Sequence, residues 1–171
     1  MSPRKNVTWG IFLGMAILLN TAGCKIYSFT GANIPTDIKT FFVDNFPNVS
    51  GNGPAELSQL FSDRLKQKML QEANLRQVNE GADLIFTGSI RGYAITYENP
   101  IQGATTALNK LTISIEVQFT NTYSGEQWTQ SFSRFAQYPA SEDINAIESR
   151  LIREINEQLA DDLFQRALVK W

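Results

Sequence analysis

Residues 111–120 read Leu-Thr-Ile-Ser-Ile-Glu-Val-Gln-Phe-Thr, so that apolar and polar side chains alternate along the whole stretch. Successive side chains of a β-strand point to opposite faces, and this pattern therefore predicts a strand with one apolar and one polar face. The apolar face needs a covering layer, whereas the polar face can remain in water. The stretch predicts an antiparallel sheet that is covered on one side only.

Four other segments have the β-branched and aromatic composition of strands. They are residues 38–46, 75–78 (a brief one), 84–97 and 126–138. Gly88 and Gly92 lie inside the third of these, where glycine indicates a bulge, increased twist or a close approach of two backbones.

Two segments repeat apolar residues at spacings of three and four, which is the helical period. The first predicts a helix over residues 54–72, with Pro54 as its first residue and Asn52 or Gly53 as its cap. The second predicts a helix over residues 141–169, with Ser141 as its N-cap. The expected buried positions are Leu57, Leu60, Phe61, Leu65 and Met69 in the first helix, and Ile144, Ile147, Leu151, Ile155, Leu159 and Leu163 in the second.

The order of these elements indicates the fold class. Two one-sided helices and a one-sided sheet bury their apolar surfaces best by packing on each other. We therefore expect an α+β fold, a two-layer sandwich in which two amphipathic helices pack on one face of a mainly antiparallel four-stranded sheet. Residues 37–171 form this single domain.

The N-terminus has the composition of an export signal. Arg4 and Lys5 precede an apolar run over residues 9–19, and Ala22 and Gly23 stand directly before Cys24. A basic start, an apolar core of about 7–15 residues and small residues at the end describe a secretory signal peptide. Residues 1–23 are expected to be removed, which leaves residues 24–36 as an N-terminal segment.

Cys24 is the only cysteine in the chain, and it stands at the predicted cleavage position. This arrangement resembles the lipobox of bacterial lipoproteins, in which the cysteine carries the lipid, although Thr21 occupies a position that is usually leucine. Residue 25 is lysine rather than the aspartate of the enteric inner-membrane retention signal, which favours the outer membrane. The alternative is an ordinary signal peptide with a cysteine nearby by chance.

Composition excludes several functions. Loss of Arg4 and Lys5 reduces the 15 cations to 13 against 17 acids, a net charge of about −4, and this argues against nucleic-acid binding. The chain has no histidine, so the commonest general base and transition-metal ligand is absent. Asp161 and Asp162 are neighbours on a predicted helix and do not share a face. We therefore expect no enzyme, no metal and no cofactor, although a serine–lysine pair stays open.

Two cations are candidate ligand-binding residues. Arg91 follows the parity of Thr87 and Ser89, which places it on the polar face of the sheet. Lys110 stands in or beside a connection over residues 98–109 that is long for a hairpin. Either residue could meet a phosphate or a partner carboxylate, or be an ordinary solvated charge.

With these elements in place, the mature sequence resembles the LptE family of lipopolysaccharide-assembly lipoproteins. The resemblance rests on the predicted lipidation region and on short patterns in four of the expected elements, together with the closing helix. These are residues 24–31, 40–43, 60–65, 82–90 and 109–113.

The resemblance implies an outer-membrane lipoprotein, anchored through Cys24, with its domain on the periplasmic side or within the lumen of the β-barrel LptD. It further implies that the protein assists assembly of this barrel and export of lipopolysaccharide, so that LptD, lipopolysaccharide and the membrane are its partners. The alternatives are a stand-alone envelope lipoprotein that binds an amphiphile or another envelope partner, and a hydrolase.

Overall fold

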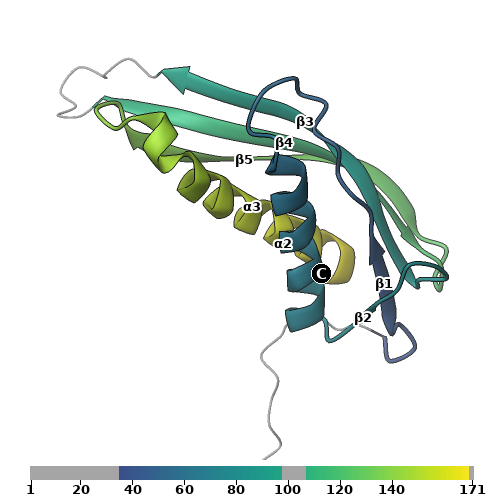
Figure 1. The fold of residues 1–171 in the computed structure, drawn as a ribbon. Helices are drawn as coiled ribbons and strands as arrows, with labels where there is room; N and C mark the ends of the chain where they lie inside the picture. Colours follow the sequence, from purple (N-terminus) through teal and green to yellow (C-terminus); the bar gives the residue numbers. More distant parts are fainter. Residues whose placement is uncertain (1–34, 98–106, 170–171) are drawn as a thin grey trace, which may run out of the picture.

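The computed structural model describes residues 35–97 and 107–169, which form a sheet with two helices on one side (Figure 1). The predicted signal peptide and Cys24 lie outside the described residues. The elements in chain order are β1 (Thr40–Val43), α2 (Leu57–Glu72), β2 (Arg76–Gln77), β3 (Leu84–Tyr97), β4 (Leu108–Asn121), β5 (Gln127–Pro139) and α3 (Ile144–Leu168). Neither helix of these residues is long and apolar enough to cross a membrane.

The sheet has five strands in the order β2-β1-β3-β4-β5, so the predicted count of four is wrong. The fifth strand is β2, which covers only two of residues 75–78. The long strands β3, β4 and β5 are antiparallel, whereas β1 is parallel to both of its neighbours. The α+β class, with both helices on one face, is confirmed (Figure 1).

The core lies between the helices and the inner face of the long strands. Every residue of β4 predicted to face inward is at most 1% exposed: Leu111, Ile113, Ile115, Val117 and Phe119. The predicted apolar positions of the second helix from Leu151 onward are also fully buried. Burial of one large aliphatic side chain contributes about 1.5–3 kcal/mol, so this layer contact is the main source of stability.

The two helices begin later than predicted. Residues 54–56 form a turn in which the Pro54 carbonyl accepts from the Leu57 N–H at 3.1 Å, and α2 starts only at Leu57. The N-cap of α3 is Asp143 rather than Ser141, because the Asp143 side chain accepts from the Asn145 N–H. Ser141 belongs instead to the preceding turn.

Charged side chains join α2 to α3 at the edge of the core. The Arg64 guanidinium donates to both carboxylate oxygens of Glu157. One turn along, Lys68 is only 6% exposed and forms ion pairs with Glu72 and Asp161. Burial opposes the charge of Lys68, but the hydrogen bonds and charges of the two carboxylates outweigh it and raise its pKa. The pairs of Arg64 with Glu157 and of Lys68 with Asp161 hold the two helices at a fixed relative position.

A bulge in β3 changes which residues face inward. Ile90 pairs with Ile115 and Gly92 pairs with Ser114, so the backbone of Arg91 is an extra residue opposite no residue of β4. As a result, both Ile90 and Tyr93 are buried although their numbers differ in parity. Such bulges re-aim the side chains that follow them.

Gly88 marks a close approach of two backbones. A Cβ atom at this position would lie 2.1 Å from the Glu116 carbonyl oxygen and 2.7 Å from the Phe46 ring. Phe46 is fully buried, so neither neighbour has room to move away. The packing of the 44–50 segment on β3 therefore requires glycine here.

Asp83 fastens the start of β1 to the start of β3. Its Oδ2 atom accepts from the Lys39 and Thr40 N–H groups, each at 2.9 Å, and from the Thr40 hydroxyl at 2.7 Å. In return, the Asp83 N–H donates to Thr40 Oγ1 at 3.0 Å. The bond from Lys39 and those from Thr40 lower the pKa of the Asp83 carboxyl below its ordinary value of 3.8.

Replacing Asp83 by alanine is expected to lower the free energy of unfolding by about 2 kcal/mol at neutral pH, because three donors lose a charged acceptor. The folded state holds this proton less tightly than the unfolded state does, so the stabilisation is complete above about pH 4 and is lost as the pH falls further. Urea unfolding should therefore show that the difference in free energy of unfolding between wild type and Asp83→Ala shrinks as the pH falls below about 4. Glu80→Ala, an exposed carboxylate nearby, is the control, and a gap independent of pH would contradict the assignment.

Candidate functional site

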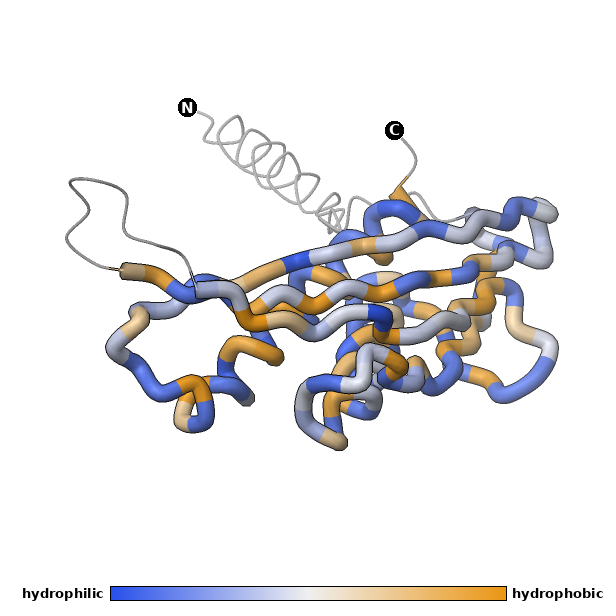
Figure 2. The backbone as a smooth tube through the Cα atoms, turned by 90° about the horizontal axis from the view of Figure 1, so that it is seen from above, coloured by the Kyte–Doolittle hydropathy of each residue, from blue (hydrophilic) through white to orange (hydrophobic). Residues whose placement is uncertain are grey.

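The outer face of the sheet carries the polar half of the alternation, and neither α2 nor α3 covers it (Figure 1). The side chains of Thr112, Ser114, Glu116 and Gln118 are all half-buried or exposed on this face of β4. Orange segments alternate with pale and blue ones along the strands in Figure 2, as expected for a sheet with one apolar face. The pairing with β5 places Ser114 opposite Ser133, and their hydroxyl groups are 2.9 Å apart.

A shallow polar hollow of about 460 Å³ lies on this face where β3 and β4 pass the segment after β1. Carboxylate, carboxamide and hydroxyl groups surround a single guanidinium. The lining residues are Asp44, Asn45, Pro47, Thr87, Gly88, Ser89, Arg91, Glu116 and Gln118.

The structure places Arg91 on the outer face, as predicted, and pairs it with Glu116. The Arg91 guanidinium donates to Glu116 Oε1 at 2.7 Å, and the two side chains are 56% and 35% exposed. A pair this exposed contributes about 0–1 kcal/mol. Because this ion pair is weak, the fold loses little stability when it breaks. Arg91 can therefore leave Glu116 and pair with another anion.

Lys110 lies within β4 rather than in the preceding connection. It pairs with Thr96 of β3 and Gln137 of β5, and its Nζ atom is 5.3 Å from the centre of the Phe135 ring. Lys110 lies six positions before Glu116, the ion-pair partner of Arg91, which is roughly 20 Å along a strand. The two predicted cations thus share one face but belong to separate places on it.

The sequence did not predict that Asp44 and Asn45 line the hollow. Asp44 and Asn45 follow β1, and only the pairing of this segment with β3 brings them beside Arg91. Alternation along β4 did place Glu116 and Gln118 on the polar face, but the ion pair with Arg91 depends on the bulge, which no pattern in β4 indicates.

Asp161 and Asp162, considered above as a possible catalytic pair, both have structural roles. Asp161 pairs with Lys68 of α2, whereas Asp162 accepts from Arg134 of β5 at 2.5 and 2.6 Å. The two aspartates thus face different elements, as expected for neighbours on a helix. Within residues 35–97 and 107–169, no group of three or more potential ligand side chains could hold a metal ion.

Comparison with known proteins assigns the family. The sequence model of the family LptE, described as lipopolysaccharide-assembly, matches residues 38–167. No curated protein matches the sequence.

Several solved structures share the fold. Protein XCC0632 from Xanthomonas campestris is 11% identical, with a TM-score of 0.56, over 80% of this chain and 87% of that one. A homologue of a neuraminyllactose-binding hemagglutinin from Helicobacter pylori is 11% identical, with a TM-score of 0.54, over 82% and 89% of the two chains. The rare lipoprotein B of Shewanella oneidensis is 16% identical, over 75% and 92% of the two chains, with a TM-score of 0.44. The first two structures, whose TM-scores exceed 0.5, support the fold alone at these identities. The family match spans almost all of the described domain, and the chain belongs to the LptE family of lipopolysaccharide-assembly proteins.

Proposed function

We propose that this protein is a lipid-anchored outer-membrane lipoprotein that assists assembly of the LptD barrel and export of lipopolysaccharide to the cell surface. The observation that carries the proposal is the family match over residues 38–167, since the LptE family acts in lipopolysaccharide assembly. A role as a non-enzymatic partner also agrees with the structural roles of the charged groups described above.

The open face of the sheet is the surface that suits a barrel. Barrel interiors are polar, and the hydroxyl groups of Ser114 and Ser133 can both donate and accept hydrogen bonds there. Few charges stand on this face, so a polar wall can approach it without a large cost of desolvation. The proposed orientation therefore turns the sheet toward the barrel wall.

Anchoring at Cys24 would also limit where the domain sits. About eleven residues separate Cys24 from Pro35, and an extended chain spans at most about 3.6 Å per residue, so the reach is about 40 Å. The described domain begins at Pro35, beside the β4–β5 turn, where the Tyr123 hydroxyl donates to Asp37 at 2.9 Å. We infer that this end of the sheet lies toward the membrane.

Cys24→Ser is expected to abolish lipid attachment, because the hydroxyl group cannot replace the thiolate as the lipid acceptor. Cells grown with labelled palmitate should give a labelled wild-type band and no labelled variant, and the variant should leave the membrane fraction. Thr21→Leu, which restores the usual lipobox residue, should remain labelled. A labelled Cys24→Ser protein would disprove the assignment of the lipid site.

Gln118→Trp is expected to reduce recovery of the barrel partner several-fold, because a bulky side chain would separate the open face from the barrel wall. The matched control is Gln165→Trp, an exposed position of α3 on the other layer, which should leave recovery unchanged. The measurement is the amount of barrel that co-purifies with the tagged protein from its own outer membrane in mild detergent. Absence of any barrel partner from the wild-type sample would refute the proposed function.

Arg91 and Lys110 are proposed to contact the phosphate groups of lipopolysaccharide. Loss of one charged hydrogen bond costs about 1.5–3 kcal/mol, so Arg91→Gln and Lys110→Gln should each weaken binding by about tenfold or more. Arg150→Gln, on the helix layer, should not change binding of purified lipopolysaccharide. Tight binding by wild type without a barrel partner in cells would favour the stand-alone amphiphile-binding lipoprotein instead.

A further inference from the structure

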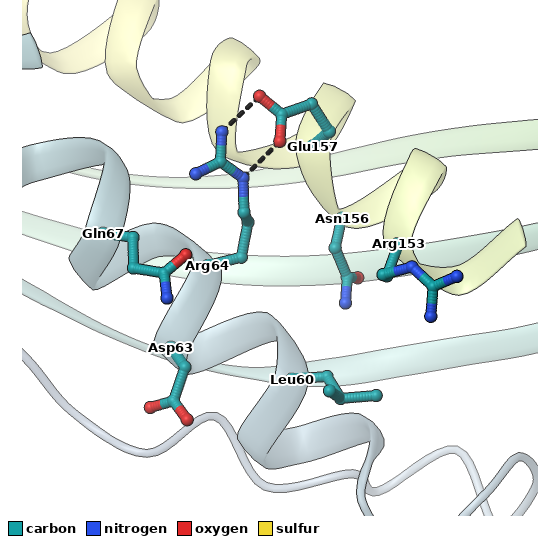
Figure 3. Close-up of a pocket in the computed structure, with 7 residues that line it drawn as sticks. All are labelled: Leu60, Asp63, Arg64, Gln67, Arg153, Asn156 and Glu157. Atoms are coloured by element: carbon teal, nitrogen blue, oxygen red, sulfur yellow. Dashed lines mark hydrogen bonds and ion pairs between the residues drawn. The ribbon is translucent and has the colours of Figure 1, made fainter. Parts of the chain in front are cut away.

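A second hollow lies on the helix layer, remote from the polar sheet face. It occupies about 470 Å³ between α2 and α3. Figure 3 shows its seven lining residues, of which those from α2 stand opposite those from α3. They are Leu60, Asp63, Arg64 and Gln67 of α2, and Arg153, Asn156 and Glu157 of α3.

Asn156 is the feature of this hollow that the fold does not explain. Its side chain is only 2% exposed, and its Oδ1 atom has no hydrogen-bond partner among the described residues. Figure 3 shows the carboxamide directed from α3 into the space between the helices. A buried polar atom without a partner costs about 1–3 kcal/mol, and an apolar residue of similar size would avoid that cost.

The charges around the hollow leave one cation without a partner. Arg64 is paired with Glu157, which closes one side (Figure 3), and Asp63 lies 3.6 Å from Lys66. Arg153 is exposed and forms no ion pair within the part of the chain that the structure describes. The hollow therefore offers one positive charge toward a ligand, beside two carboxylates that would repel a cluster of phosphates.

The remaining groups match a peptide. A carboxamide carries an acceptor and donors in one plane, as a peptide group does, so Asn156 and Gln67 can each bond to an extended main chain. Leu60 is 37% exposed at the rim, although its spacing predicted a core position, and it provides an apolar contact. One apolar contact, backbone-matching amides and a single unpaired cation together fit an extended segment with one acidic side chain.

We propose that the hollow between α2 and α3 binds an extended acidic peptide segment of a protein partner, with a main-chain N–H donating to Asn156 Oδ1 and a carboxylate paired with Arg153. The segment crosses Leu60 with an aliphatic side chain. This surface lies on the opposite layer from the open sheet face, so the protein can hold two partners at once. The assignment does not depend on the identity of the barrel partner.

The binding test uses the full-length mature protein in detergent and a displayed library of random dodecapeptides. Selection should enrich peptides that combine an aspartate or glutamate with a neighbouring aliphatic residue. The affinity of an enriched peptide should fall at least tenfold with Arg153→Gln and remain within about twofold with Arg150→Gln, because Arg150 lies near Glu142 at 3.6 Å. Peptides without an acidic consensus, or equal affinity for Arg153→Gln, would overturn the proposal.

A second measurement needs no peptide. Asn156→Leu removes the unpartnered acceptor, so it should keep or raise the melting temperature while abolishing binding of the selected peptide. A lower melting temperature would show that Asn156 serves the fold, and the proposal would fail. It would also fail if lipopolysaccharide micelles displaced the peptide from wild type and lost affinity with Arg153→Gln, since the occupant would then be an anionic lipid.

Discussion

The structure depends on burial of the one apolar face of the sheet beneath the two helices. Strict alternation along β4 puts Ile113, Ile115 and Val117 on the same side, and each of them is fully buried beneath α2 and α3. Removing this surface from water is the largest favourable contribution to the fold. The helices are consequently confined to one side, and the ion pairs between them only set their relative position. Neither α2 nor α3 covers the other side of the sheet.

This arrangement gives the molecule two surfaces of different chemistry. The sheet face is rich in hydroxyl groups and holds few charges, so it can lie against a polar wall over a wide area. The helix layer instead concentrates charge, and most of that charge is neutralised internally, as in the pairs Arg64–Glu157 and Lys68–Asp161. By contrast, Arg153 forms no ion pair and the buried Asn156 Oδ1 accepts no hydrogen bond among the described residues. The two surfaces therefore suit partners of different chemistry.

The long periodic elements could be predicted from the sequence, whereas the short and paired features could not. Alternation over ten residues determines the inner face of β4, and the helical spacing from Leu151 onward determines that of α3. By contrast, Ser141 and Asp143 are equally good caps in isolation, and only the turn after β5 selects Asp143. The two-residue strand β2 is below the length at which a pattern is visible. Leu60 and Asn156 sit where the helical period predicts neither an exposed leucine nor a buried amide, because the gap between two helices is a property of their packing.

The bulge at Arg91 divides β3 into two halves that are out of phase. Before it, even-numbered residues such as Phe86 and Ile90 face the core, and after it the odd-numbered Tyr93 and Ile95 do so. Deleting Arg91 itself would only remove the bulge, because Ile90 and Tyr93 would keep Ile115 and Ile113 as partners and would still face inward. Deleting any other residue of β3 while the bulge stays would turn one part of the strand over, so that its core side chains would face outward. Single insertions and deletions in β3 away from Arg91 should therefore survive in related sequences only where a second change restores the alternation. The length of β3 is in this sense as constrained as its composition.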